Sequence, residues 1–378
     1  MTFIDEFLPD LTVESPGRIN LIGEHTDYNL GFVMPTAIDK KIILKFRKNG
    51  SPTECKVHSL NNNETLLFSL TNIAKSPLNW ENYILGVMHE LLNRTTKIAG
   101  FDCIIQSNLP IGSGLSSSAA LECGLASGLN ALFDLGLSKE DIVVLSRAAE
   151  HNYVGTKCGI MDQYASVMSK PGFVIMLDCR SLESKYIPLN LHDYKLLLLN
   201  TNISHSLADS EYNTRLNECL EGLKMIQQKH PNSASLRDVT KPMLDEIKQK
   251  IDPVIYNRCE YIIEENDRVI AASNALKNDD LVLFGKLMYG SHDGLQHKYQ
   301  VSCPELDFLV DYSRDKEFIL GSRMMGGGFG GCTINLIHKD VVEAYTKEMS
   351  QAYRKKFNID LDAYLAMPDS GTIIKKQK

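Results

Sequence analysis

The segment that most restricts the fold lies between residues 101 and 136, where the apolar run FDCIIQS is followed by NLPIGSGLSSSAALECGLASGLNALFDLG. The first run is typical of a buried strand. Gly112 and Gly114 allow a tight turn with close backbone approach, and the serines at 116–118 can cap a helix. The small residues that follow can form this helix and let it pack closely on its neighbours. Strand, glycine loop and helix N-terminus in this order predict an anion site, because backbone N–H groups and the helix dipole there favour negative charge.

This loop is not a Walker A loop, because it lacks the Lys-Ser/Thr pair and no Lys or Arg occurs between Phe101 and Lys139. Backbone amides and a metal ion would have to meet the charge of a phosphate instead. Short glycine motifs also occur without any ligand, so a plain helix cap is the alternative. A second glycine cluster, GSRMMGGGFGGCTINL at 321–336, could be a flexible surface loop or a wall where backbone approaches a nucleotide.

Length and charge restrict the protein's class and partners. The 378 residues are enough for two packed lobes, each with its own core. The formal net charge of −7 and the pI near 5.8 argue against nucleic acid or an anionic membrane as the main partner, because both require concentrated positive charge. We therefore expect neither nucleic acid nor membrane among its partners.

The cysteines and the N-terminus indicate the compartment. Nine cysteines are scattered between Cys55 and Cys332 without a CxxC pair, a pattern that predicts neither a disulfide framework nor a structural zinc site. The acidic start MTFIDEFLPD lacks the basic region and apolar run of a signal peptide. No stretch approaches the ~20 apolar residues of a membrane span. We expect a soluble, cytoplasmic protein.

Strand-like and helix-like runs alternate in the first half of the chain, as in an α+β lobe. Strands are expected at 40–46, 101–107, 172–178, 194–202 and 331–337, and helices at 138–153, 211–228, 261–276, 281–295 and 339–357. We place a lobe boundary near residue 190, which gives an N-terminal lobe over 1–190 and a C-terminal lobe over 191–378.

Three blocks of sequence resemble the GHMP small-molecule kinases: GRINLIGEHTDYN, LPIGSGLSSSAALE and GSRMMGGGFGGCTINL. Two further stretches agree, EHNYVGTKCGIMDQYAS and SEYNTR, so the resemblance extends from residue 15 to 336. GEHTDY together with GIMDQ resembles the galactokinase branch in particular. The resemblance implies an α+β fold with an N-terminal lobe like the second domain of ribosomal protein S5, a C-terminal ferredoxin-like lobe, and an active site between them.

The resemblance also implies an activity and its site residues. Members of the branch transfer the γ-phosphoryl group of ATP to the anomeric hydroxyl of α-D-galactose, giving galactose 1-phosphate and ADP, in Leloir-type galactose metabolism. The implied catalytic pair is Asp162 and Arg18. The remaining implied residues are, for the sugar, Arg18, Glu24, His25, Asp27, Gly159 through its backbone, Asp162 and Tyr212; for the nucleotide, Gly112, Ser113, Gly114, Leu115, Ser116, Ser117, Ser118, Trp80 and Tyr83; and for Mg²⁺, Ser118 and Glu150.

The residue types suit this chemistry, because phosphoryl transfer requires positioning and charge stabilisation together with one group that orients or deprotonates the acceptor hydroxyl. Carboxylates are good acceptors for the neighbouring hydroxyls of a sugar. For Glu150, a capping box at Ser138 and Asp141 predicts a helix that could carry this side chain into the cleft.

Each of these residues also has a structural interpretation. Asp162 could cap a helix or lie on the surface, and Glu150 could be exposed on its helix. The EHTD segment could be a polar turn with His25 as a structural histidine, and Trp80 and Tyr83 could be buried in a helix core.

Two other functions stay open at this stage. One is a GHMP kinase for a different sugar, such as N-acetylgalactosamine or arabinose. The other is a galactose sensor without catalytic activity, which would be expected to have a damaged phosphate loop or catalytic pair, whereas GLSSSAALE, Arg18 and Asp162 are all present. The expected partners are galactose and ATP, with Mg²⁺ as cofactor, and we expect a monomer.

Overall fold

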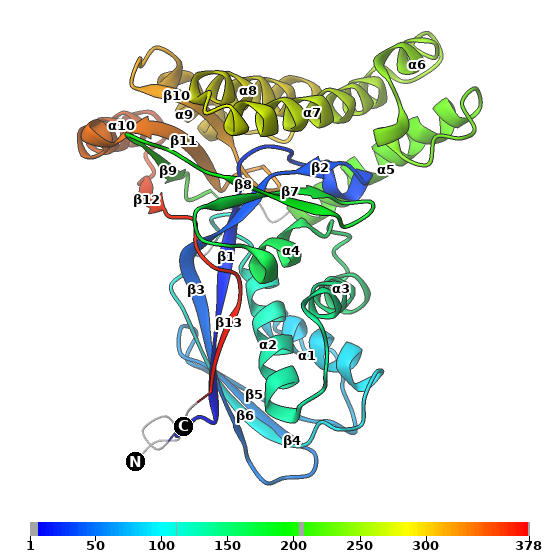
Figure 1. Ribbon diagram of the computed structural model, residues 1–378, viewed down its shortest axis with the longest axis vertical. Helices are drawn as coiled ribbons and strands as arrows, with labels where there is room; N and C mark the ends of the chain where they lie inside the picture. The colour runs from blue at the N-terminus through cyan, green and yellow to red at the C-terminus, as the bar shows by residue number, and fades with distance from the viewer. Residues whose placement is uncertain (1–6, 111, 204–207, 377–378) are drawn as a thin grey trace.

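The computed structural model describes residues 7–110, 112–203 and 208–376, and over these residues the chain forms three sheets (Figure 1). The strands are β1 (Leu11–Asn20), β2 (Phe32–Val33), β3 (Pro35–Lys48), β4 (Glu54–Ser59), β5 (Glu64–Ser69), β6 (Phe101–Ser107), β7 (Phe173–Asp178), β8 (Ser184–Pro188), β9 (Tyr194–Asn200), β10 (Ile319–Met324), β11 (Cys332–His338), β12 (Asp362–Ala366) and β13 (Ile373–Lys376). The α-helices are α1 (Asn79–Leu92), α2 (Ser117–Phe133), α3 (Lys139–Ala149), α4 (Met161–Met168), α5 (Ala208–Gln227), α6 (Lys241–Asp245), α7 (Pro253–Lys277), α8 (Leu281–Asp293), α9 (Pro304–Arg314) and α10 (Val342–Phe357).

The largest sheet has six strands in the order β13-β1-β3-β6-β4-β5, and only the β4–β6 pair is parallel. Helices α1 to α4 cover one of its faces (Figure 1). Helix α2 packs closely on this sheet through its glycines. A Cβ added at Gly124 would lie 2.6 Å from Leu44 Cδ1, and one at Gly128 would lie 2.2 Å from Phe46 Cε2. The small-residue run after the phosphate loop therefore packs as predicted.

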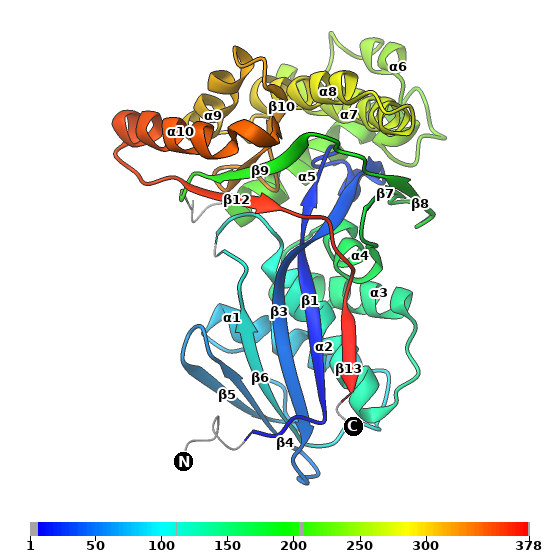
Figure 2. The ribbon, with the colours of Figure 1, turned by 60° about the vertical axis from the view of Figure 1, so that its left-hand side comes forward.

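The second half of the chain forms the antiparallel sheet β10-β11-β9-β12, with α7 to α10 on one side of it (Figure 2). The small sheet β2-β7-β8 lies between the two larger sheets. The strands and helices expected from the sequence all occur, with ends shifted by a few residues in most of them and by eight at the start of α7. The boundary near residue 190 stays a prediction, and it falls in the connection between β8 and β9.

One pairing was not expected from the sequence. Strand β13, almost at the end of the chain, returns to the six-stranded sheet and pairs antiparallel with β1, with Val13 opposite Ile374 (Figure 2). The six-stranded sheet is thus completed by both ends of the sequence. Within the described residues, no helix combines the length and the apolar composition needed to cross a membrane.

Candidate active site

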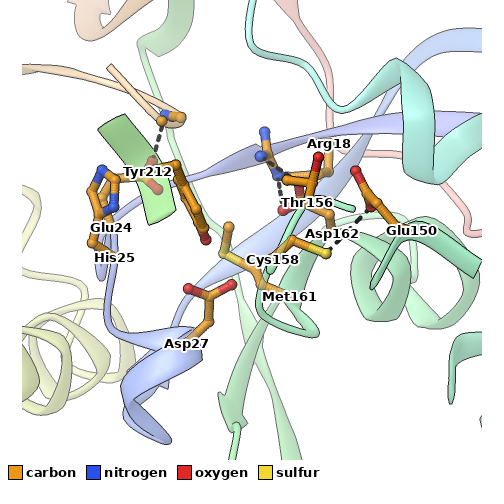
Figure 3. Close-up of a pocket in the computed structure, with 12 residues that line it drawn as sticks. Arg18, Glu24, His25, Asp27, Glu150, Thr156, Cys158, Met161, Asp162 and Tyr212 are labelled. Atoms are coloured by element: carbon orange, nitrogen blue, oxygen red, sulfur yellow. Dashed lines mark hydrogen bonds and ion pairs between the residues drawn. The ribbon is translucent and has the colours of Figure 1, made fainter. Parts of the chain in front are cut away.

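Two adjacent cavities lie where β1, α2, α4 and the second glycine cluster meet. The smaller cavity, about 160 Å³, is lined by Arg18, Glu24, His25, Asp27, Glu150, Thr156, Cys158, Met161, Asp162, Tyr212, Gly326 and Gly327 (Figure 3). The larger cavity, about 530 Å³, is lined by Arg18, Ile42, Ser59, Asn61, Asn62, Trp80, Tyr83, Ile105, Ser107, Leu109, Pro110, Gly112, Ser113, Gly114, Leu115, Ser116, Ser117, Ser118, Leu121, Asp162 and Gly327. Arg18, Asp162 and Gly327 line both cavities, so these residues mark the junction between them.

Arg18 and Asp162 form a bidentate ion pair at this junction. Arg18 donates from Nε to Asp162 Oδ1 at 2.7 Å and from Nη2 to Oδ2 at 2.9 Å. Burial by itself lowers the pKa of Arg18. The charge and hydrogen bonds of Asp162 have the larger combined effect, so the pKa of Arg18 lies above its ordinary value. Asp162 also accepts from Ser116 Oγ at 2.5 Å. Asp162 is therefore neither a free surface residue nor a simple helix cap.

A bulge in β1 positions Arg18. The pairing of β1 with β3 shifts between Pro16 and Arg18, and a bulge of this kind redirects the side chain beside it. Gly17 lies in the bulge, where an added Cβ would be 2.7 Å from Leu115 O. The Arg18 N–H donates to the same carbonyl oxygen at 3.1 Å. The glycine thus allows the phosphate loop to lie directly on β1.

The phosphate loop has the left-handed backbone that its glycines permit, with φ of 70° at Gly112 and 71° at Gly114. All nine residues predicted for the nucleotide line the larger cavity. The expected capping by serine is wrong for Ser116. It occupies the N-cap position of α2 but makes no side-chain cap hydrogen bond, because its hydroxyl donates to Asp162. The first N–H groups of α2 therefore lack a cap from Ser116, as suits an anion site.

Trp80 and Tyr83 of α1 are half-buried. Both line the larger cavity, as expected for residues near the nucleotide, and both also pack against the main apolar core, as expected for buried residues of a helix.

The turn after β1 carries Glu24, His25 and Asp27 to the smaller cavity. Glu24 is 2% exposed, accepts from the Gly326 N–H at 2.9 Å and pairs with Arg323 Nη2 at 2.8 Å. Burial raises the pKa of Glu24, although Arg323 opposes the shift. Burial and the charge of Asp162 raise the pKa of Asp27 to about 7. The turn thus holds buried carboxylates that have little access to water.

His25 has a φ of 63°, a left-handed conformation that is uncommon for a residue with a side chain. Its Nδ1 lies 2.8 Å from the hydroxyl oxygen of Tyr28. Burial lowers the pKa of His25 to about 3, so the ring is neutral at physiological pH. Tyr212 of α5 completes this wall, with its ring centroid 5.5 Å from that of His25.

Gly159 packs directly on Asp27, since a Cβ added there would lie 1.8 Å from Asp27 Oδ2. Gly159 belongs to the loop before α4, which brings Asp162 to the junction. The sequence thus places a residue without a side chain where the Asp27 carboxylate needs the space.

Glu150 follows α3, which begins with the expected capping box of Ser138 and Asp141. Its side chain is not exposed on the helix: the residue is 7% exposed and accepts from Gln163 Nε2 at 2.8 Å. Burial, followed by the charge of Asp162, raises the pKa of Glu150 to about 7, while a hydrogen bond with Ser118 lowers it. Ser118 and Glu150 therefore lie together between the two cavities.

The donor set at this place suits Mg²⁺, which prefers oxygen ligands and keeps several from phosphates and water. A cation would relieve the repulsion between the Glu150 and Asp162 carboxylates. Within the described part of the chain, no cluster of three or more His, Cys, Asp or Glu side chains could hold a metal ion. Phosphate and water oxygens would have to complete the coordination.

The second glycine cluster is not an exposed surface loop as a whole, because within residues 321–336 only Gly327 is exposed and only Gly328 and Phe329 are half-buried. Gly326 lies against the phosphate loop, where an added Cβ would be 3.4 Å from Gly114 O. Two sets of residues at the site were not predicted from the sequence: Arg323 and Gly326, which contact Glu24, and Thr156, Cys158 and Met161, which line the smaller cavity. The last three lie in the segment EHNYVGTKCGIMDQYAS, but their residue types at this spacing do not indicate a sugar site.

Comparison with known proteins identifies the family. Three family models match: GHMP kinases N terminal domain over residues 82–170, galactokinase galactose-binding signature over 2–48 and GHMP kinases C terminal over 272–355. A galactokinase from Thermotoga maritima is 43% identical over 352 residues, covering 93% of this chain and 96% of that protein. A galactokinase from Clostridium perfringens is 40% identical over 377 residues, covering 98% and 97%.

Solved structures agree with the sequence comparison. The crystal structure of Lactococcus lactis galactokinase complexed with galactose matches with a TM-score of 0.92 and 34% identity, over 97% of this chain and 95% of that chain. A mevalonate kinase structure, 22% identical with a TM-score of 0.64, shares the fold. The expected α+β fold of the GHMP kinases is therefore confirmed. The chain belongs to the galactokinase family of GHMP kinases.

Proposed function

We propose that the smaller cavity binds α-D-galactose, that the larger cavity binds ATP, and that the γ-phosphoryl group passes between them to the anomeric hydroxyl. The products are galactose 1-phosphate and ADP. The observation that carries this assignment is that Arg18 and Asp162 line both cavities. Substrates held on either side of one ion pair are positioned for direct transfer, which is the main requirement of phosphoryl transfer.

At the junction, Asp162 orients the anomeric hydroxyl and accepts its proton as the bond to phosphorus forms. Arg18 holds the Asp162 carboxylate through two hydrogen bonds. Arg18 is itself held in place because its Nη1 donates to the Gly114 carbonyl oxygen at 2.7 Å. The guanidinium also places positive charge beside the transferring group, where negative charge accumulates in the transition state. The two residues therefore act as one unit.

In the smaller cavity, the hydroxyls of galactose bind to Glu24, His25, Asp27 and Tyr212. The backbone of Gly159, which packs on Asp27 but does not line this cavity in the structure, completes the proposed sugar site. Because Nδ1 of the neutral His25 is bound to Tyr28, Nε2 is left for a sugar hydroxyl, and an ionised Asp27 accepts from two neighbouring hydroxyls. Such buried polar groups reject an analogue that lacks a hydroxyl, because a group would then be left unpaired.

In the larger cavity, the backbone of residues 112–118 binds the phosphates of ATP, and Trp80 and Tyr83 lie by the adenine. Mg²⁺ would be held by Ser118 and Glu150, and when bound it neutralises charge on the phosphates. The oxygen donor set and the two neighbouring carboxylates support this choice.

The first experiment measures ADP release with ATP and Mg²⁺ against galactose, 2-deoxygalactose, N-acetylgalactosamine, arabinose, glucose, mevalonate and homoserine. We expect rapid release with galactose and little with glucose, its 4-epimer. Faster release with N-acetylgalactosamine or arabinose would assign the chain to another sugar. Folded protein that binds galactose and releases no ADP with any of these would instead be a sensor.

We further propose a cytoplasmic monomer that acts in galactose metabolism. All nine cysteines are free thiols, and eight of them are buried, which is consistent with a reducing compartment.

A further inference from the structure

Helix α7, from the second half of the chain, contacts the backbone of the turn that carries Glu24, His25 and Asp27. Residues 23–32 are here called the sugar turn. At its start, the Gly23 N–H donates to Glu265 Oε1 at 2.9 Å, and Tyr261 Oη donates to the Glu24 carbonyl at 3.0 Å. At its end, the Phe32 N–H donates to Asn266 Oδ1 at 2.9 Å.

These three side chains are buried and held by further contacts. Tyr261 and Glu265 are fully buried and Asn266 is 7% exposed. Glu265 also accepts from Ser291 Oγ at 2.6 Å and from Arg268 Nη1 at 2.8 Å. Asn266 Nδ2 donates to the carbonyl oxygen of Ile262, one turn earlier in the same helix, at 2.9 Å. Each acceptor that faces the sugar turn is therefore fixed in direction.

The sugar turn fits against α7 without spare room. A Cβ added at Gly31 would lie 2.3 Å from Asn266 Oδ1, and one at Gly23 would lie 2.9 Å from Val269 Cγ2. Glycine at both ends lets the backbone approach the helix closely. The strained His25, with its φ of 63°, lies between these two anchored ends.

We propose that Tyr261, Glu265 and Asn266 are positioning residues for the sugar, which hold the sugar turn in the conformation that directs Glu24, His25 and Asp27 into the smaller cavity. None of the three lines either cavity, so they act through the backbone of the turn. Sugar affinity is thus set in part by a helix that does not touch the sugar. This inference rests on the proposed function of the smaller cavity.

The test compares galactose and ATP kinetics of Asn266→Ala, Asn266→Asp, Glu265→Ala and Glu265→Gln, together with galactose affinity by calorimetry. The alanine variants leave a buried N–H of the turn without its acceptor, and we expect KM and Kd for galactose to rise about tenfold or more. KM for ATP should stay within about twofold, because none of the three residues lines the larger cavity. Asp and Gln each keep an acceptor oxygen for the turn, but Asn266→Asp loses the donor to the Ile262 carbonyl and Glu265→Gln loses the charge that pairs with Arg268. Each should therefore bind galactose more tightly than the matching alanine variant without reaching wild-type affinity.

Glu264→Ala is the matched control, because Glu264 precedes Glu265 in α7 but pairs with Arg268 and Lys298 rather than with the turn. It should leave KM for galactose unchanged. An equal rise in KM for galactose and for ATP would overturn the proposal. So would galactose affinity in Asn266→Asp and Glu265→Gln that is no better than in the alanine variants. If Glu265→Ala does not fold, the two Asn266 variants decide the question.

Failure of this inference is distinguishable from failure of the proposed function. Wild-type protein that releases no ADP with galactose contradicts the function itself. Wild-type protein that phosphorylates galactose, with an unchanged galactose KM in Asn266→Ala, contradicts only the role of α7.

Discussion

Replacing Glu122 by glutamine should stabilise the protein at neutral and alkaline pH. Glu122 lies on α2, one turn after Ser118, and is fully buried. Neither carboxylate oxygen has a hydrogen-bond partner of good geometry among the described residues, and only a weak interaction with Gln163 opposes a rise in the pKa of Glu122. Burial, followed by the charges of Glu150 and Asp162, raises the pKa of Glu122 well above its ordinary value of 4.5. The folded protein therefore keeps Glu122 as the neutral acid at pH values where the unfolded chain has already lost the proton.

The size of the effect follows from proton linkage. Between pH 4.5 and the raised pKa, the folded state binds one more proton at Glu122 than the unfolded state. The free energy of unfolding then falls by about 1.4 kcal/mol for each pH unit of increase. Glutamine has nearly the same shape as the neutral acid and cannot ionise, so Glu122→Gln avoids this loss. For a chain of this length the gain corresponds to roughly 2 °C in Tm per pH unit.

The assay is thermal unfolding of Glu122→Gln and wild type from pH 5 to pH 8, without nucleotide or metal ion. The difference in Tm should be small at pH 5 and grow as the pH rises. Glu140→Gln, an exposed residue in the first turn of α3, serves as the control and should show no such growth. A Tm difference that is constant or shrinks with pH would mean that Glu122 is ionised in the folded protein, and would refute the reasoning.

Four further predictions concern the site. Asp162→Asn should abolish most turnover while galactose binding stays detectable by calorimetry, and wild-type rates in this variant would remove Asp162 from the mechanism. Asp27→Ala should raise KM for galactose by leaving sugar hydroxyls unpaired, and unchanged KM and kcat would place Asp27 outside the pocket. Gly159→Ala should raise the galactose KM about tenfold, because its Cβ would come within 1.8 Å of Asp27 Oδ2 and force that carboxylate to move; an unaltered KM would show that the loop yields instead. Because burial raises the pKa of Asp27 to about 7, galactose affinity at constant ionic strength should increase from pH 6 to pH 8 as the carboxylate ionises. Asp27→Asn should not show this increase, and an affinity of the wild type that does not change with pH would contradict this role.

Local features of the sequence predicted local structure well. The capping box at Ser138 and Asp141 marked the start of α3, and the small residues of α2 marked its close packing on the sheet. These signals work because the interacting groups are a few residues apart or because glycine itself permits the close contact.

Features that depend on distant segments could not be read from the sequence. The Arg18–Asp162 pair joins residues 144 positions apart, and only the family resemblance brought them together beforehand. Ser116 was expected to cap α2, but Asp162, supplied by another helix, provides a charged acceptor for its hydroxyl. The burial of Glu122 likewise arises from packing, because nothing in its neighbouring residues distinguishes it from a surface glutamate.

The pairing of β13 with β1 has a consequence for how the chain acquires its fold during synthesis. Until residues 373–376 have left the ribosome, β1 is the outermost strand of its sheet, and its backbone groups on that side are open to other partners. The first half of the protein therefore cannot complete its sheet while the rest is still being made. Such long-range closure slows folding and leaves an exposed strand edge that chaperones or aggregation can engage.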